Sequence, residues 1–230
     1  MIRLFVPDSL SANQPVFLSE SHLHYLRHVM RRQVGDPVLL FNGRDGEWQS
    51  TLQKLDKKSG VCLPQQQTRI QVLPEKRILC PALIKKENMD LILQKATELG
   101  VSDIYPLLTE RTVVSKLNLE RAQSLVIEAT EQSERLTVPS IHNPQKIAAV
   151  LSQLPQNVTP ICLSERGQTT APLSAGKSYA FFVGPEGGWT PAELTFFEQN
   201  QVLFWHLGTT ILRAETASIA ALSCASFCLD

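Results

Sequence analysis

Two glycine-containing loops hold most of the residues whose types and spacing suit chemistry. The first, Gly184-Pro-Glu-Gly-Gly188, follows a short apolar stretch, and the second, Gly208-Thr-Thr-Ile-Leu-Arg-Ala-Glu215, follows another. Glycine allows a positive φ and lets the main chain approach a ligand, because no Cβ stands in the way. Two such loops predict one ligand site that both of them face.

Three side chains in these loops can handle charge or a proton: Glu186, Arg213 and Glu215. A carboxylate accepts a proton as a general base, and an arginine stabilises a developing oxyanion or holds a phosphate. A structural interpretation is also open, in which Arg213 pairs with Glu186 or Glu215 and only fixes the loop. The sequence does not decide between them.

Each loop must be positioned by the strand before it and the helix after it. Thr190, Pro191 and Glu193 have the spacing of a capping box with proline at the first helical position, so a helix is predicted directly after the first loop. The helix predicted over 216–228 is rich in small apolar residues and has little polar face. It needs cover nearly all round, either from the core of its own chain or from a second copy.

From residue 78 onward, apolar strands alternate with helices. Strands are predicted over 78–84, 104–108, 160–163, 179–183 and 202–207, and helices over 88–99, 119–133, 145–154, 191–200 and 216–228. This alternation is typical of a parallel sheet covered on both faces. The segments 164–167, 184–188 and 207–212 then lie at the carboxyl ends of strands, where open α/β sheets bind ligands.

The N-terminal part reads mostly as short strands, over 2–6, 37–41, 48–52 and 60–63, with turn signals at Asn42-Gly43 and Asp45-Gly46. A small barrel is the expected closure. The proline and charges of 72–77 mark a domain boundary, which predicts domains over 1–73 and 74–230.

A helix capped by Ser19 interrupts these strands, with Leu23, Leu26 and Met30 at helical spacing. The rest of its surface carries the sharpest basic cluster of the chain, formed by His24, Arg27, His28, Arg31 and Arg32. Such a cluster is either a solvated helix face or an RNA contact.

Composition limits the class of protein. With 230 residues, 43% hydrophobic and 19% charged, the chain is an ordinary globular protein with net charge zero. Residues 1–77 hold 11 Lys/Arg against 7 Asp/Glu, and 78–230 hold 11 against 15. The basic first part is compatible with RNA binding, although so small an excess also arises by chance.

Several classes are excluded. The fingerprints G-x-G-x-x-G, G-x-x-x-x-G-K-[ST] and G-x-S-x-G are absent, which argues against common nucleotide sites and hydrolases. Neither a signal peptide nor a membrane span is recognisable, so a cytoplasmic location without membrane association is expected. The cysteines Cys62, Cys80, Cys162, Cys224 and Cys228 form no C-x-x-C pair, so neither disulfides nor a metal site are expected.

Two further strings complete a recognisable pattern: Gln94-Lys-Ala-Thr-Glu-Leu-Gly-Val101 and Glu128-Ala-Thr-Glu-Gln-Ser-Glu-Arg135. With the two loops, they make the chain resemble, nearly end to end, the ribosomal RNA small subunit methyltransferase E family of the SPOUT (trefoil-knot) class. Glu134 stands where that family usually has glycine, and Thr209-Thr210 precede Ile211 where a proline is common.

The resemblance implies a fold and a reaction. It implies an N-terminal PUA-like RNA-binding β-barrel and a C-terminal SPOUT-type α/β knot with a parallel sheet, whose last helix threads under a loop. It also implies a homodimer that uses S-adenosylmethionine, without a metal, to methylate N3 of a uridine in 16S rRNA, within the small ribosomal subunit. The alternative is a non-catalytic RNA-binding or assembly factor that kept the fold.

The resemblance also assigns residues. Cofactor binding falls to Leu163, Gly184, Gly187, Gly188, Leu207, Gly208, Ile211 and Leu212. The catalytic candidates are Arg213, Glu186 and Glu215, since the N3 proton must leave and negative charge must be stabilised. RNA contacts fall to Arg27, Arg31, Arg32 and Lys95, although the buried face of its helix favours reading Lys95 as plain helix surface.

Overall fold

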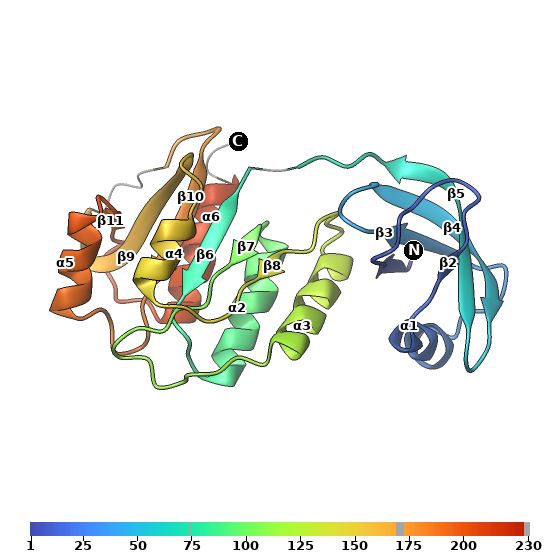
Figure 1. Ribbon diagram of the computed structural model, residues 1–230, viewed down its shortest axis with the longest axis horizontal. Coiled ribbons are helices and arrows are strands. Elements are labelled where there is room, and N and C mark those ends of the chain that lie inside the picture. The colour runs from blue at the N-terminus through green and yellow to red at the C-terminus, as the bar shows by residue number, and fades with distance from the viewer. Residues whose placement is uncertain (74, 169–172, 228–230) are drawn as a thin grey trace. The chain divides into compact units, whose positions relative to one another are not determined.

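The computed structural model describes residues 1–73, 75–168 and 173–227 and divides into two compact units (Figure 1). The first unit comprises Met1–Leu73 together with Thr130–Val138. The second comprises Pro74–Ala129 and Pro139–Asp230. A short piece of chain from the middle of the sequence therefore belongs with the N-terminal unit.

The first unit is a curled five-stranded sheet in the order β1-β3-β4-β5-β2. Its strands are β1 (Arg3–Phe5), β2 (Val16–Phe17), β3 (Pro37–Phe41), β4 (Glu47–Leu55) and β5 (Gly60–Arg69). β1 pairs parallel with β3, and the other neighbours are antiparallel. The predicted strands are present, and the two-residue β2, too short to show a pattern, was not predicted.

The predicted helix begins at its expected cap. In α1 (Glu20–His24), the Ser19 hydroxyl accepts a hydrogen bond from the His22 N–H. A π-helical turn, η1 (Tyr25–Val29), continues the helix, and Leu23 and Leu26 are buried in the core of the sheet. The apolar spacing thus fixes which face of the helix is buried.

Arg3 ties the segment Thr130–Val138 to the first unit. Its guanidinium is buried against the Glu47 carboxylate, with Nε 2.7 Å from Oε2. The same side chain donates to the carbonyl oxygens of Thr130, Glu131 and Arg135. Glu134, within this segment, has φ 58°. A glycine takes that left-handed conformation without strain, which gives a physical reason for the glycine usual in the family.

The second unit contains a six-stranded sheet in the order β11-β9-β10-β6-β7-β8, in which every pair is parallel. Its strands are β6 (Arg77–Pro81), β7 (Asp103–Ile104), β8 (Ser140–Ile141), β9 (Val158–Gln168), β10 (Ser178–Val183) and β11 (Leu203–Trp205). Its helices are α2 (Lys86–Glu98), α3 (Leu119–Gln132, whose last turn belongs to the first unit), α4 (Ile147–Gln153), α5 (Pro191–Gln199) and α6 (Ala214–Phe227). The predicted fold class, a parallel α/β sheet with a small β unit, is confirmed.

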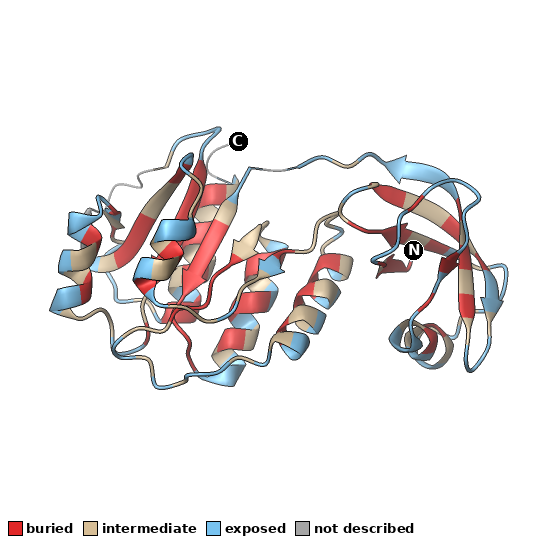
Figure 2. Ribbon diagram, viewed as in Figure 1, coloured by how far each residue is buried: buried red, intermediate tan, exposed pale blue. Residues whose placement is uncertain are grey.

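Helices cover both faces of this sheet. All six residues of β10 are buried, as Figure 2 shows for the central strands. Phe182 packs in one cluster with residues of α4 and α5, such as Val150 and Phe197. On α6, contacts run to α2, β6 and β10. Strands buried on both faces need the continuous apolar runs seen in the sequence.

The helix α6 is only partly covered within this chain. Its buried stripe comprises Ala214, Glu215, Ser218, Ala221, Leu222 and Ala225. Ile219, Ala220 and Ser223 are half-buried and Phe227 is exposed, while Cys228 lies outside the described residues. The described part of the chain has no helix with the length and apolar character needed to cross a membrane.

Candidate active site

A cavity of about 790 Å³ lies where the predicted loops meet. Leu163 of β9, which pairs with Val183 at the end of β10, lines it, as does Trp205 at the end of β11. The predicted residues brought together here are Leu163, Gly184, Glu186, Gly187, Gly188, Leu207, Ile211, Leu212, Arg213 and Glu215. Gly208, the remaining predicted cofactor-binding residue, is not among the lining residues.

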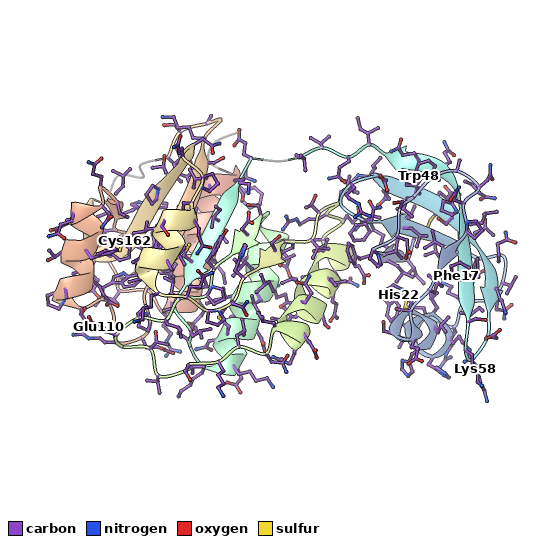
Figure 3. All side chains as sticks on the ribbon, viewed as in Figure 1. Phe17, His22, Trp48, Lys58, Glu110 and Cys162 are labelled. Carbon is purple, nitrogen blue, oxygen red and sulfur yellow. The ribbon has the colours of Figure 1, made fainter. Side chains whose placement is uncertain are left out.

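The first junction, from β10 to α5, is held by a complete capping box. The Thr190 hydroxyl accepts from the Glu193 N–H, and the Glu193 carboxylate accepts from the Thr190 N–H at 2.8 Å. The other carboxylate oxygen of Glu193 accepts from the N–H of Glu110 (Figure 3) at 2.9 Å. Each oxygen of this buried carboxylate therefore has a partner.

Arg111 holds the same loop from outside it. Its Nη1 donates to the carbonyl oxygens of Gly187, at 2.7 Å, and Trp189, at 3.4 Å. The side chain is exposed and also lines the cavity. Nothing in the sequence around Arg111 indicated this contact, because its partners are main-chain atoms 76 and 78 residues away.

Trp189 explains why the loop begins with glycine. A Cβ at Gly184 would lie 3.1 Å from the indole ring of Trp189. The indole Nε1 donates to the carbonyl oxygen of Leu163 at 2.9 Å and so connects the loop to β9. Side-chain packing, rather than a ligand, therefore accounts for the missing Cβ at Gly184.

Gly188 differs from its neighbours in the loop. Its φ is +68°, and a Cβ there would meet no heavy atom within 4 Å. A Cβ at Gly187 would touch the aliphatic part of Arg111 at 3.4 Å, an ordinary contact. The backbone conformation favours glycine at Gly188, and the space beside that residue is open.

At the second junction, from β11 to α6, fewer polar contacts are found among the described residues. The Gly208 N–H donates to the His206 carbonyl oxygen, and the Ala217 N–H donates to the Arg213 carbonyl oxygen. Arg213 is exposed at the cavity and pairs with neither Glu186 nor Glu215 within 4.0 Å. The structural interpretation of these three residues, an ion pair that fixes the loop, is therefore not what the structure shows.

The two carboxylates of the loops have opposite environments. Glu186 is exposed to solvent. Glu215, in the first turn of α6, is only 8% exposed. Its Oε2 is buried without a hydrogen-bond partner among the described residues.

The predicted RNA-contacting residues lie elsewhere. Arg27 and Arg32 are half-buried and Arg31 is exposed, all at or after η1 in the first unit. Arg32 lies 3.7 Å from Asp36. Lys95, on α2, does not line the cavity and pairs with Glu98 at 2.8 Å.

Two buried cysteines, Cys62 and Cys162, are poor nucleophiles. Burial raises the pKa of the Cys62 thiol to about 12. Burial and then the Glu193 carboxylate raise the pKa of Cys162 (Figure 3) well above its usual range. The described residues include no group of three or more His, Cys, Asp or Glu side chains arranged to hold a metal.

Sequence reasoning missed other residues that line the cavity: Lys85, Asn88, Arg111 and Trp189. Lys85 and Asn88 come from the start of α2, which follows a different strand. Trp189 directly follows the glycine loop, and an aromatic residue at that position was the sequence signal that could have identified it as a cavity residue.

Family models match both units. A model described as an RNA methyltransferase domain matches residues 71–226, and one described as an RNA methyltransferase PUA domain matches residues 18–64. Curated relatives match over nearly the whole chain. The ribosomal RNA small subunit methyltransferase E of Rickettsia conorii is 33% identical, over 96% of this chain and 93% of that protein.

Solved structures agree with this match. A ribosomal RNA small subunit methyltransferase E from Neisseria gonorrhoeae, crystallised with S-adenosyl methionine, superposes with a TM-score of 0.92 at 31% identity, covering 100% of this chain and 98% of that chain. A methyltransferase from Legionella pneumophila in complex with the same cofactor gives a TM-score of 0.88 at 28% identity, covering 97% and 96%.

Proposed function

Because this chain belongs to the ribosomal RNA small subunit methyltransferase E family, we propose that it transfers a methyl group from S-adenosylmethionine to N3 of a uridine in 16S rRNA. One observation carries the proposal beyond family membership. Residues of both glycine loops, distant in sequence, line one cavity at the carboxyl ends of parallel strands.

The residues of this cavity fit the proposed methyl donor. A volume of about 790 Å³ lies within the roughly 300–1,000 Å³ typical of small-molecule sites. Gly188 offers main chain beside open space, and Leu163, Leu207, Ile211 and Leu212 supply apolar residues around the loops. When bound, S-adenosylmethionine supplies an activated methyl group and its own leaving group. We assign its binding to these residues with Gly184, Gly187 and Gly208.

The charged residues of the site are suited to act on the uracil, which is the proposed nucleophile. Arg213 is exposed at the cavity and free of Glu186 and Glu215, so we assign it to a developing uracil oxyanion or a flanking phosphate. A cation is poorly suited to a donor that already carries a sulfonium charge. Glu186 and Glu215 are the candidate proton acceptors.

We assign residues 1–73 to a PUA-like RNA-binding domain and 74–230 to the SPOUT methyltransferase domain. The proposed RNA contacts are Arg27, Arg31 and Arg32 in the PUA-like domain and Lys95 in the SPOUT domain.

Replacing Arg27, Arg31 and Arg32 with glutamine should weaken RNA binding and lower the slope of log affinity against log salt by up to about 2, with cofactor affinity unchanged. The matched control neutralises Lys54, Lys57 and Lys58 at the β4–β5 turn. An equal loss of RNA affinity in both triple variants would mean that the three arginines act only through their general positive charge.

We further propose a cytoplasmic homodimer acting on rRNA in the small ribosomal subunit, with no membrane association. The half-buried face of α6, including Ile219 and Ala220, supports a subunit contact there. Sedimentation equilibrium of the wild-type chain, compared with an Ile219→Arg variant, tests this assembly.

The proposed reaction is tested by calorimetry with S-adenosylmethionine, followed by mass mapping of rRNA from a deletion strain. Binding of the cofactor and loss of one methyl group from a uridine of 16S rRNA are expected. A chain that binds RNA but not the cofactor would instead be an assembly factor that kept the fold.

A further inference from the structure

Glu215 lines the cavity and has a buried acceptor that the described part of the chain leaves without a hydrogen-bond partner. It lies in the first turn of α6, lines the cavity and is 8% exposed. Its Oε2 is buried with no hydrogen-bond partner among the described residues. Because a buried polar atom without a partner loses its hydration and gains nothing in return, its presence needs an explanation.

A second glutamate in the same type of position shows what a structural role looks like. Glu193 lies in the first turn of α5 and is 7% exposed. Its two oxygens accept from the N–H groups of Thr190 and Glu110. Both helix N-termini favour a carboxylate electrostatically, but among the described residues hydrogen-bond donors to it are found only at α5.

The other carboxylates that line the cavity are satisfied differently. Glu165 and Glu186 are exposed, so water can solvate them. Among the described lining residues, Glu215 is therefore the carboxylate with a buried acceptor that neither a protein donor nor solvent satisfies. Shielding also favours proton transfer from a bound donor over exchange with bulk water.

We propose that Glu215 accepts the N3 proton of the target uracil, an inference that rests on the proposed function. The N3–H bond breaks and its proton binds the carboxylate of Glu215. The electron pair of N3 forms the bond to the methyl carbon, while the C–S bond of the donor breaks and its electrons remain on sulfur. Arg213, two residues earlier and exposed at the same cavity, stabilises the negative charge on the uracil oxygens.

The first test is Glu215→Gln, which keeps the size of the side chain and removes its basicity. We expect kcat to fall by roughly 10²–10⁴, the range for loss of a general base. Affinities for S-adenosylmethionine and RNA, measured by calorimetry, should change little. The remaining rate should rise about tenfold per pH unit, since hydroxide must then remove the proton, whereas the wild-type rate should depend on pH much less.

The second test is rescue of Glu215→Ala by formate, a small carboxylate that can enter the space left by the side chain. Formate should restore part of kcat in this variant and none in Glu193→Ala. Glu198→Gln, an exposed change on α5, controls for the loss of one negative charge.

Three results separate the possible failures. Normal kcat in folded Glu215→Gln would overturn the inference, as would a pH profile parallel to the wild type with no formate rescue. A loss explained entirely by weaker cofactor binding would assign Glu215 to an amino group of the cofactor instead. No methylation of uridine by the wild-type chain would overturn the proposed function itself.

Discussion

The two strand–loop–helix junctions at the cavity differ in how fully the protein satisfies their polar groups. The β10–α5 junction has a complete capping box, a clamp from Arg111 and an indole bond from Trp189 to Leu163. The β11–α6 junction presents an exposed Arg213 and a buried Glu215, one oxygen of which has no hydrogen-bond partner in the part of the chain that the structure describes. Their sequences look alike, yet among the described residues only the first junction satisfies both oxygens of its buried glutamate.

This difference between the junctions indicates different roles, cofactor binding for the first and the reaction itself for the second. A loop whose hydrogen bonds are already made is preorganised, which suits recognition of a cofactor at low entropic cost. A loop with unmatched charged groups is suited to the reacting atoms, where charge appears only during the reaction. We therefore expect changes in the first junction to act mainly on cofactor affinity and changes in the second mainly on turnover.

The largest expected effect in the first junction is that of Gly188→Val. Its side chain would project into the open space beside the loop, and cofactor affinity should fall by roughly 10² or more. Gly35→Val is a matched control, because Gly35 also has a positive φ, +97°, with no heavy atom near its Cβ, but lies in the other unit. Calorimetry that finds equal cofactor affinity in both folded variants would remove Gly188 from the binding site.

Arg213→Ala tests the second junction. The methylation rate should fall by roughly 10², as for loss of one electrostatic stabiliser, with little change in cofactor affinity. Single-turnover kinetics on rRNA and calorimetry measure the two quantities separately. If cofactor affinity fell as much as the methylation rate, Arg213 would instead be a residue that holds the loop in place. The two junctions would then not differ in function.

Arg111→Ala is expected to show the reverse pattern. Loss of the bonds to the Gly187 and Trp189 carbonyl oxygens loosens the loop, and cofactor affinity should fall by about tenfold, since a charge-assisted bond contributes about 1.5 kcal/mol. Arg111→Lys keeps the charge without the planar fork and should recover only part of the affinity. A defect confined to RNA affinity would reassign Arg111 to phosphate contact.

The smallest expected effect compares the two buried glutamates by stability. Glu193→Gln should lower the free energy of unfolding by about 1–2 kcal/mol, because one oxygen acceptor of the cap is lost. Glu215→Gln should leave the stability of the ligand-free chain unchanged or raise it, because an unmatched buried charge is removed. Urea unfolding of both variants measures this difference. Equal destabilisation would show that Glu215 has a structural partner after all.

Local patterns predicted much of this molecule. The capping box at Thr190 and Glu193 and the cap at Ser19 were readable because their partners lie three residues away. The strands of the parallel sheet were readable because burial on both faces demands apolar runs. The ends of elements were less well predicted: the strand expected over 104–108 is observed only at Asp103–Ile104 and continues as isolated bridges at Leu107.

The sequence by itself determined the fold class, the two loops and the residue types of the site, since these depend on periodicity and on short-range hydrogen bonding. The tertiary structure alone decided which charges are matched. The Arg111 clamp and the burial of Glu215 are long-range facts, as is the attachment of Thr130–Val138 to the first unit through Arg3. The local capping box supplies one donor to the Glu193 carboxylate, but its second donor, the Glu110 N–H, comes from a segment 83 residues away, and no local pattern encodes the position of such a donor.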